Sequence, residues 1–124
     1  MRPIYLDHGA TTPVRPETVA AMTAELQLGG NPASLHAPGR AARTRLEENR
    51  EVIAEALGAT PSEVIVTSGG TESDNIAVTG TYRRRRREDD RRTRVLISTL
   101  EHSAVIDTAE NLAEHEGAQV TWVP

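Results

Sequence analysis

The 124-residue sequence contains neither cysteine nor lysine, and these two absences restrict its chemistry more than anything it contains. Without cysteine the chain has no disulfide, no thiol nucleophile and no thiolate metal ligand. All 14 basic residues are arginine, so no side-chain amine can act as a nucleophile. A guanidinium cannot replace that amine, because it stays protonated and delocalised.

Aromatic residues and long apolar runs are also scarce. Aromatics make up 2% of the chain and phenylalanine is absent, so any core must be mainly aliphatic. The net charge of −4 argues against nucleic acid binding by the chain as a whole. No apolar stretch approaches the length that crosses a bilayer, and residues 1–7 lack the apolar core of a secretory signal. The composition predicts a soluble cytoplasmic protein, of the size of one ordinary domain, with no membrane or nucleic acid partner.

The spacing of apolar residues predicts helices and strands that alternate through the second half of the chain. Residues 1–14 are expected to be irregular, apart from a short strand that residues 4–6 could form. The expected elements are a helix from Pro16 to the Gly29-Gly30 pair, a helix at 40–57, a strand at 64–66, a helix at 71–82, a strand at 95–97, a helix at 103–116 and a strand at 119–123. This alternation predicts an α/β fold with a mostly parallel sheet, in which three strands alternate with helices.

Residues 82–94 are strongly biased toward arginine. They include eight arginines and three acidic residues, so the local charge is about +5 and that of the remaining chain about −9. A basic patch of this kind could bind nucleic acid or an acidic partner. No aromatic platform or nucleic-acid-binding motif accompanies it, so we expect a solvated helix end followed by a surface loop.

Residues 67–73, Thr-Ser-Gly-Gly-Thr-Glu-Ser, connect the first strand of this series to the following helix. The first N–H groups of a helix have no internal partner and lie at the positive end of its dipole, so this turn can bind a phosphate. Gly70 allows close approach of the backbone, and the Thr71 hydroxyl can add a donor. The same residues also fit an ordinary tight turn with Thr71 as helix cap. They match neither the P-loop, whose lysine is missing, nor the dinucleotide-binding fingerprint.

His102 follows the second strand of the series, where the next helix begins. In open α/β sheets, ligands gather at the carboxyl ends of the strands, so His102 and the Gly70-Thr71 turn are expected at one edge. An imidazole there can stack on a planar cofactor and can transfer protons near neutral pH. The alternative is a histidine that only packs locally at a helix start.

Four segments together resemble the NifS/IscS-type cysteine desulfurases, which are pyridoxal 5′-phosphate (PLP) enzymes of fold type I. They are residues 5–13, residues 30–36 with Gly39, residues 67–75, and the Glu101-His102 pair. They occur in the order of the family and extend over nearly the whole chain. Mild departures are Gly9 and Gly70 where alanine is usual, and Ala33 where serine is usual.

This resemblance implies roles for particular residues and an arrangement of domains. Gly70 and Thr71 would hold the PLP phosphate, and His102 would stack on the pyridine ring as a catalytic residue that takes part in proton transfer. No metal is implied. Residues 15–124 would begin the large PLP-binding domain, and residues 1–14 would pack against a small domain. Three loop residues would line or brace the active-site mouth: Asn31, Ser34 and His36.

In this family the reaction removes sulfur from L-cysteine, leaving alanine and a persulfide on an enzyme cysteine for iron–sulfur cluster or thio-cofactor assembly. The resemblance also implies a homodimer and a sulfur-acceptor protein. The lysine that holds PLP, the aspartate that pairs with its ring nitrogen and the catalytic cysteine lie further along the family's sequence. We therefore expect an N-terminal fragment that is inactive alone. Two alternatives stay open: a non-catalytic truncated module or pseudogene product, and a related fold type I lyase or aminotransferase.

Overall fold

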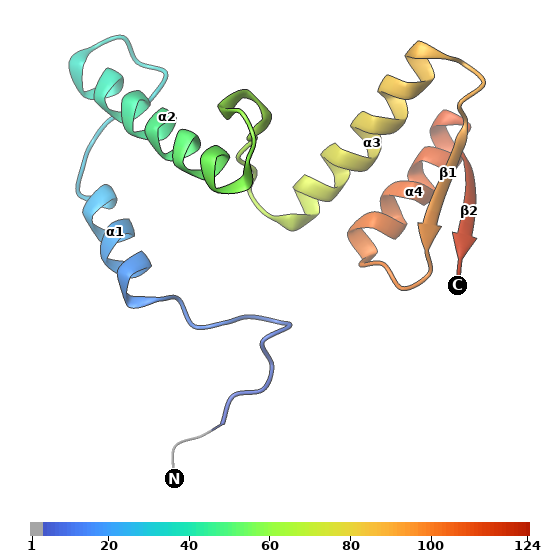
Figure 1. Ribbon diagram of the computed structural model, residues 1–124, viewed down its shortest axis with the longest axis horizontal. Helices are drawn as coiled ribbons and strands as arrows, with labels where there is room; N and C mark the ends of the chain where they lie inside the picture. The colour runs from blue at the N-terminus through green and yellow to red at the C-terminus, as the bar shows by residue number, and fades with distance from the viewer. Residues whose placement is uncertain (1–3) are drawn as a thin grey trace. The chain divides into compact units, whose positions relative to one another are not determined.

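The computed structural model describes residues 4–124, which form four α-helices, one 3-10 helix and two β-strands (Figure 1). They divide into two compact units, one ending at Val64 and the other spanning Ile65–Pro124. Each unit is described by itself. Among residues 4–124, no helix is both long enough and apolar enough to cross a membrane.

The first unit contains α1 (Pro16–Leu26), α2 (Ala37–Leu57) and the 3-10 helix η1 (Pro61–Glu63). Helix α1 begins at Pro16, whose fixed φ suits the first helical position, with Glu17 at the positive end. It has no buried residue, and Leu26 at its end is 83% exposed. An ion pair of 2.9 Å between Arg45 Nε and Glu25 Oε2 joins α2 to α1. The apolar face predicted for α1 is therefore present but not covered by described residues.

The loop between α1 and α2 is tightly folded around Gly39, which is buried. A Cβ atom at Gly39 would lie 2.4 Å from Ser34 O and 2.8 Å from Asn31 O. Such distances are far below van der Waals contact, so only glycine fits between these backbone atoms. Glycine at this position is thus required by the path of the loop.

The second unit contains α3 (Gly70–Glu88), β1 (Arg94–Ser98), α4 (Ser103–Glu116) and β2 (Gln119–Val123). The strands pair in parallel, from Arg94 opposite Gln119 to Ser98 opposite Val123, and α4 is the crossover between them. Helix α4 ends at Gly117, which adopts the left-handed conformation with φ 70°. The small core consists of three buried residues and two partly buried valines: Tyr82, Leu112, Ala118, Val78 and Val95.

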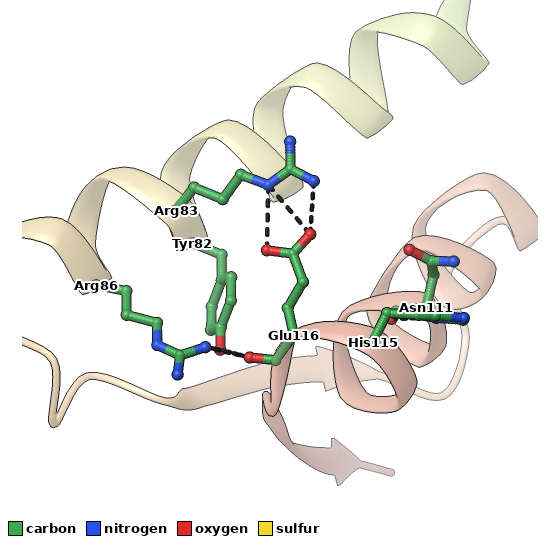
Figure 2. Close-up of polar contacts among 6 residues, drawn as sticks. All are labelled: Tyr82, Arg83, Arg86, Asn111, His115 and Glu116. Atoms are coloured by element: carbon green, nitrogen blue, oxygen red, sulfur yellow. Dashed lines mark hydrogen bonds and ion pairs between the residues drawn. The ribbon is translucent and has the colours of Figure 1, made fainter.

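Polar contacts join α3 to the end of α4 (Figure 2). The Arg83 guanidinium donates to both carboxylate oxygens of Glu116, with Nε at 3.1 Å from each. The Tyr82 hydroxyl donates to the Glu116 carbonyl oxygen at 3.0 Å, and Arg86 donates to the same oxygen. The Arg83 side chain holds the pKa of the Glu116 carboxyl below its ordinary value. These contacts satisfy carbonyl and carboxylate groups that a helix end otherwise leaves to water.

Most elements of the second unit lie where the sequence predicts them. Helix α4 and strand β2 have the predicted bounds, and the predicted α/β class is confirmed. Residues 64–66, predicted as a strand, are extended at Val64 (φ −94°, ψ 114°) but form no strand. A strand requires a hydrogen-bonded neighbour, and no described strand lies beside these residues. The described sheet therefore has two strands rather than three. Residues 4–6 are likewise not a strand.

Helix α3 is longer than predicted, since it continues past Tyr82 to Glu88. Arginine favours helix formation, and Glu88 pairs with Arg84 at 3.2 Å and with Arg85 at 3.3 Å. Basic residues also suit the negative end of the helix dipole. The arginine-rich segment is therefore a solvated helix end followed by a turn, as the sequence indicates.

Candidate active site

The turn at the start of α3 presents free backbone N–H groups. The first backbone bond of the helix runs from Ser73 N to Gly69 O at 3.1 Å. Within residues 4–124, no atom accepts a hydrogen bond from the N–H groups of Gly70, Thr71 or Glu72. Three donors at a helix N-terminus, with the helix dipole behind them, form an arrangement that suits a phosphate.

Side chains around this turn bond to the turn itself and leave those N–H groups free. Glu72 Oε2 accepts from Ser68 N at 2.6 Å and from Ser68 Oγ at 2.8 Å. The Ser68 backbone N–H, and after it the Ser68 hydroxyl, hold the pKa of the Glu72 carboxyl below its ordinary value. The Thr67 and Ser73 hydroxyls lie 2.7 Å apart. The Glu72 carboxylate is therefore directed at the preceding turn.

The space over the two glycines is open. A Cβ atom at Gly69 or Gly70 would meet no atom within 4 Å. Neither glycine is required for packing within the described chain, in contrast to Gly39. Open space in front of unpartnered N–H groups allows an anion to approach the backbone directly.

His102 is the N-cap of α4. Its Nδ1 accepts a hydrogen bond from Ala104 N at 3.1 Å, so the neutral ring carries its proton on Nε2. The ring is exposed, and Nε2–H has no partner among the described residues. His102 therefore has a local structural role, as one interpretation of the sequence held, and it also keeps one ring nitrogen available.

The first turns of α3 and α4 share one groove of about 340 Å³, which both Thr71 and Ala104 line. Side chains connect the two helices there: Thr108 Oγ1 lies 2.8 Å from Asn75 Oδ1, and Asn75 Nδ2 donates to Thr71 O at 2.8 Å. The structure thus brings Thr71 close to the helix start that His102 caps. Asn75 belongs to the 67–75 segment that resembles the family but received no role there, and Thr108 lies outside the segments that carry the resemblance. No local sequence signal identifies this pair, because the two residues lie 33 positions apart in the sequence.

The loop residues predicted near the active-site mouth lie in the first unit and make local bonds. Asn31 Oδ1 accepts from Ala33 N at 2.9 Å. His36 is the N-cap of α2, and its Nδ1 accepts from Gly39 N at 3.3 Å. Ser34 N donates to Asn31 O at 2.9 Å. These bonds define the loop, while the role at an active-site mouth stays a prediction.

A larger hollow of about 800 Å³ lies between α3 and the start of β1, away from the turn and from His102. Its lining combines apolar residues with arginines, including Arg85 and Arg94. It contains no acid, base or nucleophile arranged for catalysis. Within residues 4–124, no three histidine or acidic side chains gather as metal ligands.

Comparison with known proteins identifies the family. The model of the aminotransferase class-V family matches residues 4–124, so the chain belongs to that family. Within it, the chain is 56% identical over 120 residues to the IscS-like cysteine desulfurase of Mycobacterium tuberculosis, and 43% identical over 124 residues to the cysteine desulfurase IscS of Dictyoglomus turgidum. These alignments include 97% and 99% of this chain but 30% of each relative.

Solved structures agree with this result. A NifS-like protein superimposes with a TM-score of 0.78 at 35% identity, over 93% of this chain and 31% of that protein. The NifS-like protein of Rickettsia africae gives 0.73 at 30% identity, over 97% and 31%. The resemblance to NifS/IscS-type cysteine desulfurases and the type I fold are thereby confirmed. The chain spans about 30% of the length of the relatives that it matches.

Proposed function

We propose that this chain provides the phosphate- and ring-binding part of a PLP-dependent cysteine desulfurase. The observation that carries the proposal is the pair of helix starts in the second unit. One presents free N–H groups at Gly70 and Thr71, and the other carries the exposed His102 ring. The relatives are named as cysteine desulfurases, and they align over both segments.

The residues present fit the cofactor. The N–H groups of Gly70 and Thr71, with the Thr71 hydroxyl, would hold the phosphate through charge-assisted hydrogen bonds. His102 would lie against the pyridine ring, and its Nε2 would accept or donate a proton at the substrate. Its Nδ1 bond to Ala104 N fixes the ring orientation. When bound, PLP would supply the electron sink for cleavage of the carbon–sulfur bond of L-cysteine.

These 124 residues cannot supply every group that the reaction needs. Covalent attachment of PLP requires an amine and persulfide formation requires a thiol, and the sequence contains neither lysine nor cysteine. We therefore propose that desulfurase activity requires residues outside this sequence, and that the chain alone is inactive. A homodimer and a sulfur-acceptor protein belong to the same proposal, as does a cytoplasmic location.

A hybrid enzyme tests the proposal directly. In the hybrid, residues 4–124 replace the matching segment of the M. tuberculosis relative, to which the chain is 56% identical. We expect PLP binding and formation of alanine from L-cysteine, with sulfide released when a thiol reductant is added to reduce the persulfide. Replacing His102 by glutamine should lower kcat about 100-fold or more. Replacing Thr71 by valine should weaken PLP binding about 10-fold, whereas Thr81→Val, further along α3, should not.

A hybrid that folds and binds PLP but releases no alanine from L-cysteine would refute the proposed activity. Equal PLP affinity in the Thr71→Val and Thr81→Val variants would refute the placement of the phosphate. The chain alone offers a second test, in which PLP should bind weakly and borohydride should trap no side-chain adduct. An adduct on an internal residue would contradict the argument from composition, and peptide mapping separates it from one on the terminal amine.

A further inference from the structure

We propose that Asn75 and Thr108 are positioning residues, which hold the first turns of α3 and α4 together so that the phosphate-binding N–H groups and His102 act on one cofactor. The inference rests on the proposed function, because it assigns these two residues to the same site. We assign neither of them a direct contact with the cofactor. Their effect would pass through Thr71 on one helix and His102 on the other.

A continuous series of hydrogen-bonding distances links the two helix starts. Asn75 Nδ2 donates to Thr71 O at 2.8 Å, and Asn75 Oδ1 lies 2.8 Å from Thr108 Oγ1. Thr108 Oγ1 lies 2.7 Å from Ala104 O, and Ala104 N donates to His102 Nδ1 at 3.1 Å. The series thus begins at a residue of the phosphate turn and ends on the imidazole.

Thr108 has one hydroxyl proton but two acceptors within reach. It can donate to Asn75 Oδ1 or to Ala104 O, and not fully to both. Ala104 O already has the helical N–H of Thr108 as a partner, whereas Asn75 Oδ1 has no other donor among the described residues. The cross-helix bond to Asn75 is therefore the one that needs the hydroxyl.

The place of this bond distinguishes it from general packing between α3 and α4. At the other end of the helices, Tyr82 and Arg83 bond to Glu116, and Leu112 lies in the core. At the end that carries the predicted site, Asn75–Thr108 is the one side-chain hydrogen bond between the helices in residues 4–124. Thr108 is 5% exposed and is the one buried polar residue there. A buried hydroxyl without its acceptor is costly, so the bond constrains how the two helix starts approach.

The experiment uses the hybrid holoenzyme that contains this chain. Thr108→Val preserves the shape and removes the hydroxyl, and we expect it to raise the dissociation constant for PLP about fivefold. Thr108→Ser restores the hydroxyl and should bind PLP within about twofold of the unmodified hybrid. Thr23→Val is the matched control, because the Thr23 hydroxyl also bonds to a carbonyl four residues back, at 2.8 Å, but in α1. It should leave PLP binding unchanged.

Two further measurements separate positioning from simple stabilisation. Asn75 is exposed, so Asn75→Leu tests the same bond from a position that does not disturb the core. Asn75→Leu and Thr108→Val both remove the same Asn75–Thr108 bond. The double variant should therefore bind PLP no more weakly than whichever single variant binds it more weakly. The pH profile of kcat/KM should also shift in the Thr108→Val variant, and in Thr108→Ser it should match that of the unmodified hybrid.

The outcomes distinguish this inference from the proposed function. An unmodified hybrid without PLP binding or desulfurase activity would refute both. An active hybrid in which Thr108→Val and Asn75→Leu match the unmodified protein would refute only the positioning role. Effects of Thr108→Ser as large as those of Thr108→Val, or additive effects in the double variant, would also overturn it. If Thr108→Val is insoluble, Asn75→Leu decides: a PLP affinity equal to that of the unmodified hybrid refutes the role.

Discussion

Heating the isolated 124-residue chain should give no cooperative unfolding transition. Seven large apolar residues of the second unit are exposed, whereas three are buried: Tyr82, Ile97 and Leu112. The exposed fractions are 69% for Ile65, 63% for Val66, 45% for Ile76, 65% for Leu96, 89% for Leu100, 39% for Trp122 and 43% for Val123. Together they equal about four fully exposed side chains, whose burial would contribute roughly 6–12 kcal/mol. That is as large as the net stability of an ordinary domain, about 5–15 kcal/mol.

Calorimetry and the fluorescence of an apolar dye check this prediction. We expect a broad heat absorption for the chain alone, with dye binding already at low temperature, because apolar surface is accessible before heating. The hybrid enzyme, in which further protein can cover the same residues, is the control and should melt cooperatively without early dye binding. The reasoning would be refuted if the chain alone, as a monomer, melted in one sharp transition with an enthalpy near 0.7 kcal/mol per residue.

Two further predictions concern single residues in the hybrid enzyme. Gly39→Ala should lower the stability of the hybrid by about 1–3 kcal/mol, because the added Cβ forces the loop apart. Gly29→Ala is the control and should cost far less, because a Cβ there meets nothing within 4 Å. Equal melting temperatures for the two variants would contradict the close approach of Gly39 to Ser34. The bond from Arg83 lowers the pKa of Glu116 in the folded protein. The stability that this ion pair contributes should therefore be present above the unfolded-state pKa of Glu116, and it should be lost as pH falls through the lower folded-state pKa. Unfolding followed from pH 7 to pH 3 should show this loss, and Glu116→Gln should remove that part of the pH dependence; an unchanged pH dependence in the variant would count against the ion pair.

The sequence predicted those elements whose bounds are set by residues adjacent to them along the chain. Helix α4 could be predicted to the residue, because Gly117 ends it and an apolar stripe runs along it. Strand β2 also has the bounds predicted from the sequence, Gln119–Val123. Residues 64–66 show the limit of this reasoning, since their β-branched composition is typical of a strand. A strand nevertheless forms only beside a partner, and local composition does not reveal whether that partner is present.

The candidate site also has features that the sequence reveals and a contact that it does not. The turn at Gly70-Thr71 and the position of His102 at a helix start follow from short sequence patterns, because N-caps and free N–H groups are local properties. The structure adds what the local pattern cannot contain, a bond between residues 33 positions apart in the sequence, Asn75 and Thr108. A lone asparagine or threonine in a helix has many explanations, so neither residue could be identified before the helices were placed side by side.

The sequence allows two interpretations of this turn, and its contacts support the phosphate-binding one, which stays a prediction. At Gly39 backbone atoms occupy the room that a Cβ would need, but Gly69 and Gly70 have no such neighbours. Instead a Cβ at either position would meet open space, while the N–H groups of the first turn of α3 stay unpartnered within residues 4–124. Open space and unpaired donors at the same place are what an external anion would use. A site at that turn therefore explains features of the described chain that its own packing does not require.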